Sequence, residues 1–225
     1  SKKNLESLKK LGIKDSNVTV LENGYDSEIF YPLDKRKVRE SLGIKQDDKI
    51  VVAVGSLENI KGHKYLIEAI SLLQKKYKNL KCYIVGGGSL EHKLRVLIKE
   101  LDLETKVFLL GHIPHAQVNN WMNASDLFVM PSLNEGLPVV MLEALGCGKP
   151  FVGSNVGGIP EVINSDRYGI LVRSKDPIQL SNAIDISLTK NWDEEAIMKY
   201  GSKFTVKNLV SRTLDSYLEL FKDND

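Results

Sequence analysis

Two carboxylates flank a Gly-Leu-Pro turn in the segment NEGLPVVMLEALGCGKP, which covers residues 134–150. Glu135 precedes the turn, and Glu143 is the only charge among the apolar residues 139–145. A carboxylate inside an apolar helix costs free energy unless something satisfies it. No basic residue lies within a helical turn of Glu143, but a pair of vicinal hydroxyls, as on ribose, could satisfy both of its oxygens. Exposure to solvent on an edge of the helix explains the spacing equally well.

The turn between the two acids predicts an anion site. Pro138 fits the first helical position, because its missing N–H would have no partner there. The N–H groups of the following residues then point out of the helix start and can bind an anion such as a diphosphate. Glu135, in the loop before the helix, would lie near whatever is attached to that phosphate.

A lysine occupies a comparable place earlier in the chain. The stretch from Gly55 to His63 leaves a predicted strand, contains Lys61 and enters a helix after a glycine. A cation beside a helix start suits a phosphate, although the spacing is not that of a P-loop. Taken alone, Lys61 would more often be an ordinary surface lysine.

Two further strand ends allow more than one interpretation. Glycines 86–88 either let the backbone approach a ligand or form a plain tight turn, with Ser89 as the N-cap of the next helix. The dinucleotide pattern G-x-G-x-x-G fails, because Glu91 occupies the place of the third glycine. The stretch 111–115 could offer backbone groups and an apolar side chain to a flat base. His112 and His115 lack a third ligand nearby, so we expect no metal site and a structural or exposed role for each.

Between these sites, short β-branched runs alternate with helical patterns. This alternation, with strands that are apolar throughout, predicts a parallel sheet covered on both faces. The expected fold class is α/β, a doubly wound Rossmann-like sheet of about six strands. Predicted strands cover residues 50–55, 80–86, 107–111, 126–131, 150–154 and 169–172, with a brief one at 18–21. Predicted helices cover residues 2–11, 35–42, 62–77, 90–101, 115–123, 138–146, 160–164 and 177–188, and a wholly helical tail covers 193–221.

Size and composition limit the function classes. The 225 residues are 42% hydrophobic and carry a net charge of +2, enough for one large domain with a core and too neutral for a broad nucleic-acid surface. Cys82 and Cys147 have no partner at ligand spacing, so they are expected to be buried free thiols in a reducing cytosol. No apolar run reaches the roughly 18 residues that a membrane-spanning helix needs.

Several of these motifs, in this order, resemble the donor-binding half of a GT-B glycosyltransferase, closest to the large retaining family 4. The family signature is a strand ending in Pro-Ser followed by a glutamate, seven residues and a second glutamate, which Glu135 and Glu143 match here. The resemblance covers residues 18–220. Other matching motifs are NGYD at 23–26, ALGCGKP at 144–150, VGGIPE at 156–161 and GILV at 169–172.

The resemblance implies roles for individual residues. Glu135 would contact the transferred sugar, Lys61 the diphosphate and Glu143 the ribose hydroxyls, with Glu135 and Lys61 as the catalytic pair. Ser56 stands where the family usually has an arginine, so one cation is missing. The implied co-substrate is a nucleoside diphosphate sugar, with no cofactor and no metal. The full donor-binding set is Ser56, Lys61, His112, Ile113, Pro114, Glu135, Gly136, Leu137, Pro138, Val139, Val140 and Glu143.

The same resemblance implies a larger protein. Residues 1–32 would be a linker from a missing N-terminal acceptor domain, 33–190 the donor domain, and 191–225 helices that cross toward the missing domain. The fragment alone would bind donor but turn over little. A cytoplasmic location is expected, with peripheral attachment at the inner face of a membrane left open. The base, the sugar and the acceptor (a glycan, a lipid or a protein) are left open too.

Three other functions remain as alternatives. The chain could be a non-catalytic nucleotide-binding or interaction domain. It could belong to another GT-B class, such as a nucleotide-sugar epimerase or a phosphorylase. A nicotinamide dehydrogenase is disfavoured by the failed glycine pattern.

Overall fold

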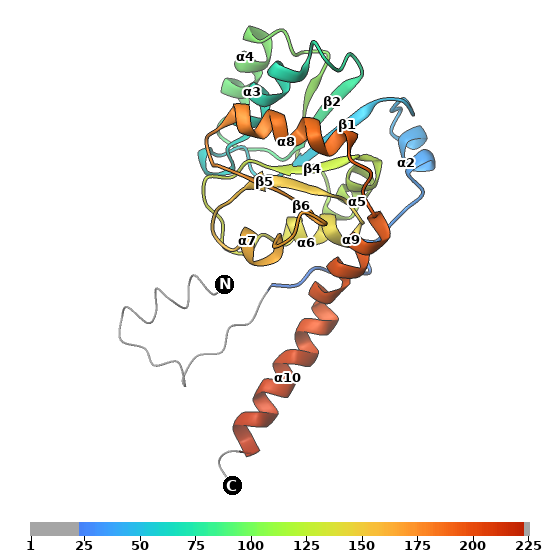
Figure 1. Ribbon diagram of the computed structural model, residues 1–225, viewed down its shortest axis with the longest axis vertical. Coiled ribbons are helices and arrows are strands. Elements are labelled where there is room, and N and C mark those ends of the chain that lie inside the picture. The colour runs from blue at the N-terminus through green and yellow to red at the C-terminus, as the bar shows by residue number, and fades with distance from the viewer. Residues whose placement is uncertain (1–22, 223–225) are drawn as a thin grey trace, which may run out of the picture.

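The computed structural model describes residues 23–222 of the chain (Figure 1). The helix expected at residues 2–11 and the strand expected at 18–21 lie outside this part. Among the described residues, no helix is both long and apolar enough to cross a membrane.

A single sheet of six parallel strands forms the centre of the fold, as predicted. The strand order is β3-β2-β1-β4-β5-β6, and the two halves of the sheet extend in opposite directions from β1 and β4. Val52 of β1 is paired with Tyr83 of β2 on one side and with Phe128 of β4 on the other. The strands are β1 (Lys49–Val54), β2 (Leu80–Val85), β3 (Val107–Gly111), β4 (Leu127–Met130), β5 (Phe151–Ser154) and β6 (Gly169–Val172).

Helices cover both faces of the sheet, with α3 (His63–Leu73), α4 (Glu91–Glu100) and α8 (Pro177–Thr189) on one side (Figure 1). On the other side lie α5 (His115–Ala124), α6 (Val139–Gly146), α7 (Ile159–Val162) and α9 (Glu194–Gly201). Successive strand residues therefore enter two different cores, because strand side chains alternate between faces. Ile50 and Val52 lie in the core beneath α5 and α6, whereas Val51 and Ala53 lie in the core beneath α3 and α8. This double burial explains the continuous apolar strands.

The observed helices begin and end within a few residues of the expected ones. The largest difference is at the helix expected over residues 62–77, which ends at Leu73. The helices are α2 (Lys35–Ser41), η2 (Asn59–Lys61), α3 (His63–Leu73), α4 (Glu91–Glu100), α5 (His115–Ala124), α6 (Val139–Gly146), α7 (Ile159–Val162) and α8 (Pro177–Thr189). Both cysteines are buried free thiols, as expected.

The tail is not one continuous helix, contrary to the prediction. It forms α9 (Glu194–Gly201), η3 (Ser202–Phe204) and α10 (Val206–Lys222), with Thr205 extended between the last two. The backbone of Tyr25 causes the break, because its N–H donates to the Phe204 carbonyl and its carbonyl accepts from the Val206 N–H, both at 2.9 Å. Beyond this point α10 projects away from the sheet and its helices (Figure 1).

Candidate active site

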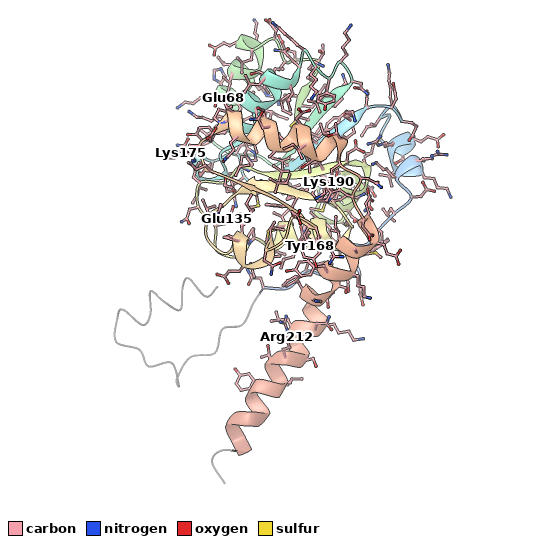
Figure 2. All side chains as sticks on the ribbon, viewed as in Figure 1. Glu68, Glu135, Tyr168, Lys175, Lys190 and Arg212 are labelled. Carbon is pink, nitrogen blue, oxygen red and sulfur yellow. The ribbon has the colours of Figure 1, made fainter. Side chains whose placement is uncertain are left out.

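The candidate site lies where β1 and β4 end. These neighbouring strands continue to opposite halves of the sheet, which makes this edge the topological switch point at which open α/β sheets bind ligands. Lys61 follows β1 and Glu135 follows β4. Figure 2 shows Glu135 on the same side of the sheet as Lys175, which follows β6, and Lys190 on the opposite side.

Lys61 and Glu135 form an ion pair across this edge. Lys61 Nζ donates to Glu135 Oε1 at 2.7 Å, and the same oxygen accepts from the Ser132 hydroxyl at 2.8 Å. The two charged side chains are 24% and 9% exposed. Sequence reasoning predicted both charged residues but not their contact, and it did not predict Ser132 as a ligand of Glu135.

Backbone contacts hold the Glu135 loop in place. The Leu133 N–H donates to the Ile60 carbonyl of the β1 loop, and the Gly158 N–H donates to the Gly136 carbonyl, each at 2.7 Å. Gly157 has a φ of +58°, and a Cβ there would lie 1.7 Å from the Glu135 carbonyl oxygen. A glycine is therefore required at Gly157, which gives the VGGIPE motif a structural reason.

The N-terminus of α6 opens beside the Glu135 loop. Pro138 is the N-cap and not the first helical residue as expected, because its ψ of 121° is extended. No side chain caps this end, and the N–H groups of Val139 and Val140, in the first turn, have no acceptor within the helix. Asn23 closes the loop from outside by donating to the Leu137 carbonyl at 2.7 Å. An uncapped helix start of this kind is typical of anion sites.

Glu143 lies in the middle of α6 and is only 4% exposed. The alternative of a solvent-exposed carboxylate on the helix edge is therefore wrong. Burial raises the pKa of Glu143 above its usual range, while the hydrogen bond and the charge of His115 lower it. His115 Nε2 lies 2.9 Å from Glu143 Oε1. The partner that the sequence lacked within a helical turn comes from α5, 28 residues away along the chain.

The predicted base strip follows β3. His112 and Pro114 are exposed, and Ile113 is partly buried against the core. Ser56 is exposed in the β1 loop, two strands from this strip. Within residues 23–222, none of these four side chains forms a hydrogen bond with Lys61 or Glu135. In the same part of the chain, no group of three or more His, Cys, Asp or Glu side chains could hold a metal ion.

The triple glycine serves backbone packing. A Cβ on Gly86, whose φ is +140°, would lie 2.1 Å from the Gly55 carbonyl oxygen. The Leu57 N–H donates to the Gly87 carbonyl at 2.9 Å. Ser89 is not the helix N-cap, since its hydroxyl and N–H donate to the Glu58 carboxylate at 2.9 and 3.0 Å. The glycines thus fix the β1 loop that carries Lys61.

His63, the first residue of α3, is a buried residue that the sequence did not single out. It is 4% exposed, and neither ring nitrogen has a hydrogen-bond partner within the described residues. Its pKa is lowered from 6.5 to about 4, mainly by burial and to a smaller extent by the charge of Lys61. The backbone of Gly55 and Ser56 lies close enough to oppose this shift in part, without the geometry of a hydrogen bond. The ring is therefore neutral at pH 7.

A cavity of about 500 Å³ lies away from this site, at the edge where β1 and β4 begin. Two of its cationic side chains share one partner: Arg39 donates to Asp126 at 2.9 Å, and Lys35 also pairs with that carboxylate. Lys49 donates to the Leu188 carbonyl. These pairings make the cavity part of the fold's framework and separate it from the candidate site.

The match to a known family agrees with this geometry. Residues 34–204 match the family model described as glycosyl transferases group 1, and the chain belongs to that family. The matched region contains both site loops, all six strands and α6.

Relatives and solved structures support the assignment. An uncharacterized glycosyltransferase of Methanocaldococcus jannaschii is 30% identical over 213 residues, covering 90% of this chain and 54% of that protein. A D-inositol 3-phosphate glycosyltransferase of Paenarthrobacter aurescens is 28% identical, covering 90% and 52%. The crystal structure of Anabaena HepE in complex with UDP superposes with a TM-score of 0.80 at 25% identity, covering 92% and 60%. The chain spans about half the length of the curated relatives it matches.

Proposed function

We propose that this chain is the donor-binding part of a retaining family 4 glycosyltransferase of GT-B architecture. It would hold a nucleoside diphosphate sugar whose sugar is transferred to an acceptor with retention at the anomeric carbon. One observation carries the proposal: the Lys61–Glu135 pair lies beside the uncapped start of a helix that also contains the buried Glu143. A cation, a helix N-terminus and a recessed carboxylate match the diphosphate and the ribose of such a donor.

The diphosphate is the leaving group in this reaction. As the bond between the sugar and the phosphate breaks, negative charge grows on the diphosphate oxygens, and the acceptor hydroxyl loses its proton as it bonds to the sugar. Lys61 and the N–H groups at the start of α6 would stabilise that charge without a metal or another cofactor. Ser56 supplies no charge in the β1 loop, so Lys61 is the principal cation of the proposed site.

The other parts of the donor are assigned by position. Glu135 would contact the sugar, since it precedes the helix start that receives the diphosphate. Gly136 and Leu137 would offer backbone groups beside it. Glu143 would accept the ribose hydroxyls, and the strip 112–114 would line the base. Glu135 is not assigned as a nucleophile, because the second carboxylate is committed to ribose.

We further propose that full activity depends on a second, acceptor-binding domain. We propose residues 1–32 as a linker from an acceptor-binding domain, 33–190 as the donor domain and 191–225 as helices that cross back. The exposed apolar side chains along α10 fit a surface for that domain. They are Val206, Val210, Leu214 and Tyr217, which are 44% to 57% exposed. A cytoplasmic location goes with this proposal, and attachment to the inner face of a membrane is left open.

Donor binding tests the proposal directly. UDP, GDP and ADP, each with a matching sugar nucleotide, are titrated by calorimetry and in thermal melts. We expect one series to bind in the micromolar range, and ligand at 100 times its dissociation constant stabilises a fold by about 2.7 kcal/mol. Glu143→Gln should weaken this binding, whereas Glu100→Gln, an exposed change on α4, should not. A protein that binds none of the three, or binds NAD instead, would overturn the donor assignment and favour an interaction module or a dehydrogenase.

A further inference from the structure

A chain of ring and hydrogen-bond contacts connects the segment before α2 to Glu143. The ring of Phe30, 1% exposed, meets the ring of His115 edge-on, with centroids 4.8 Å apart and planes at 62°. His115 Nε2 in turn lies 2.9 Å from Glu143 Oε1. The His115 side chain is 61% exposed, so burial does not hold its ring against Glu143. Its contacts with Phe30 and Glu143 are what keep it in place.

The far end of α5 is fixed by the same segment. Asn123, 1% exposed, accepts a hydrogen bond from the Leu33 N–H at 2.8 Å and donates to the Tyr31 carbonyl at 3.0 Å. Residues 30–33 therefore hold α5 at both ends, through His115 at its start and Asn123 in its last turn. This double attachment sets the position of the His115 ring relative to α6.

The contact between His115 and Glu143 leaves part of the carboxylate unused. An ionised carboxylate only accepts hydrogen bonds and offers about four lone-pair sites on its two oxygens. Among residues 23–222, His115 is the only side chain hydrogen-bonded to Glu143, and it occupies Oε1. Burial favours the protonated acid, which could donate but would accept less well; the charge and hydrogen bond of His115 favour the ionised form. His115 thus acts on both the direction and the charge of the group.

We propose that His115 is a positioning residue for the nucleotide: supported by Phe30, it aims the Glu143 carboxylate so that its free acceptor sites meet a vicinal diol. The inference rests on the proposed function, since it presumes that Glu143 binds ribose. The inference adds that His115 affects nucleotide affinity only through the 2′- and 3′-hydroxyls that Glu143 would bind. His115 acts through Glu143 and needs no contact of its own with the ligand.

The test compares nucleotides with and without the diol. UDP, GDP and ADP are each paired with the 2′,3′-dideoxynucleoside diphosphate, and binding to the whole chain is measured by calorimetry. His115→Ala should weaken binding of the ribonucleotide about tenfold, the loss of roughly one charge-assisted hydrogen bond. The dideoxy ligand should bind wild type and His115→Ala equally, within twofold. His115→Gln, which retains a side-chain N–H donor, should recover most of the lost affinity.

Two further variants separate positioning from general damage. In a Glu143→Gln background, His115→Ala should cause no additional loss, because contacting residues that act as one unit are not additive. Phe30→Leu should reduce ribonucleotide affinity severalfold and spare the dideoxy ligand. His92→Ala, a change at an exposed histidine of α4, should leave both ligands unaffected. Thermal melts of each variant establish that it is folded.

The outcomes are distinguishable. If wild type binds a ribonucleotide and Glu143→Gln weakens it, but His115→Ala has no effect or weakens both ligands equally, the proposed function stands and the role of His115 is wrong. If wild type binds no nucleotide, or binds the dideoxy ligand as tightly as the ribonucleotide, ribose recognition by Glu143 is wrong and the role of His115 falls with it.

Discussion

Lys61 Nζ and Glu135 Oε1 lie 2.7 Å apart, although the two residues are 74 positions apart in the chain. The contact exists because β1 and β4 are neighbours in the sheet while the chain between them builds the other half. A diphosphate arriving at the start of α6 would compete with Glu135 for the same ammonium group. The ion pair with Glu135 holds the Lys61 ammonium group at the ends of β1 and β4.

This arrangement predicts a phosphate-specific loss on removing the lysine. Lys61→Ala should reduce affinity for a nucleoside diphosphate by about 10- to 100-fold, since hydrogen bonds to charged groups contribute about 1.5–3 kcal/mol. Affinity for the corresponding nucleoside, which has no phosphate, should be unchanged. Calorimetry with both ligands measures the two effects. Lys64→Ala, an exposed lysine on the next turn, is the control; an equal loss in that variant would show a general charge effect instead.

Because the Glu143 carboxyl group is buried in α6, we expect its replacement by an uncharged side chain to raise the stability of the fold. Burial raises the pKa of Glu143 above its ordinary 4.5, so the folded state holds that proton to higher pH than the unfolded chain does. Stability from this group is full at low pH and is lost as pH rises through the folded pKa. Glu143→Gln should therefore be more stable than wild type at neutral pH, while its nucleotide binding is weakened.

Thermal melts between pH 4 and 8 check this sign. The difference in melting temperature between Glu143→Gln and wild type should grow as pH rises from 4.5 and then become constant. Glu100→Gln should show no such pH-dependent gain. A Gln variant that is less stable than wild type at pH 8 would mean that the His115 contact outweighs the cost of burying the carboxylate.

His63 predicts an acid-sensitive fold. Its pKa is lowered from 6.5 to about 4, mainly by burial, so the unfolded chain takes up a proton in this window that the folded chain does not. Stability is fully present above about pH 6.5 and falls as pH decreases toward 4. Each pKa unit is worth about 1.4 kcal/mol, so the loss reaches about 3 kcal/mol.

Urea unfolding at a series of pH values from 4 to 7 measures this loss. His63→Gln should flatten the stability profile between pH 6.5 and 4, since its side chain does not titrate. The exposed His92→Gln should retain the wild-type slope. If the His63 variant keeps that slope, the acid sensitivity belongs to other groups.

The fold could be predicted from the sequence because its signals are local. Each strand is an apolar run followed by a turn and a helical pattern, and this alternation alone indicates a doubly wound sheet. Lys61 and Glu135 were predicted as separate residues at strand ends. Their contact could not be predicted from local patterns, because it depends on the order of strands across the sheet.

Most of the missed features depend on long-range contacts, although the hydrogen bond from Ser132 to Glu135 spans only three residues. Nothing around His115 indicates that it would face Glu143, since the two helices that carry them belong to different parts of the chain. The break at Thr205 is held by the Tyr25 backbone, and the Thr205 hydroxyl also accepts from the Asn208 N–H in the first turn of α10, at 3.3 Å. Likewise, Ser89 has the residue type of an N-cap, but its hydroxyl is taken by Glu58 from a neighbouring loop.

The triple glycine gives a matched test of the framework that holds Lys61. A Cβ on Gly86 would lie 2.1 Å from the Gly55 carbonyl oxygen, whereas a Cβ on Gly87 meets nothing within 4 Å. Gly86 also has a φ of +140°, which L side chains rarely adopt, and Gly87 has no such constraint. Gly86→Ala should therefore destabilise the fold by about 2 kcal/mol or more, in the range of strained backbone positions, and Gly87→Ala should be nearly neutral.

Because Gly86 packs on the residue that begins the Lys61 loop, the effect should extend to ligand binding. Chemical denaturation gives the stability of both variants, and calorimetry with a nucleoside diphosphate gives their affinity. Gly86→Ala should reduce the affinity for the nucleoside diphosphate more than the affinity for the nucleoside, since the displaced loop carries Lys61, the proposed phosphate ligand. Equal stability of the two variants would mean that the loop shifts without cost, and that the close contact between Gly86 and Gly55 does not constrain the site.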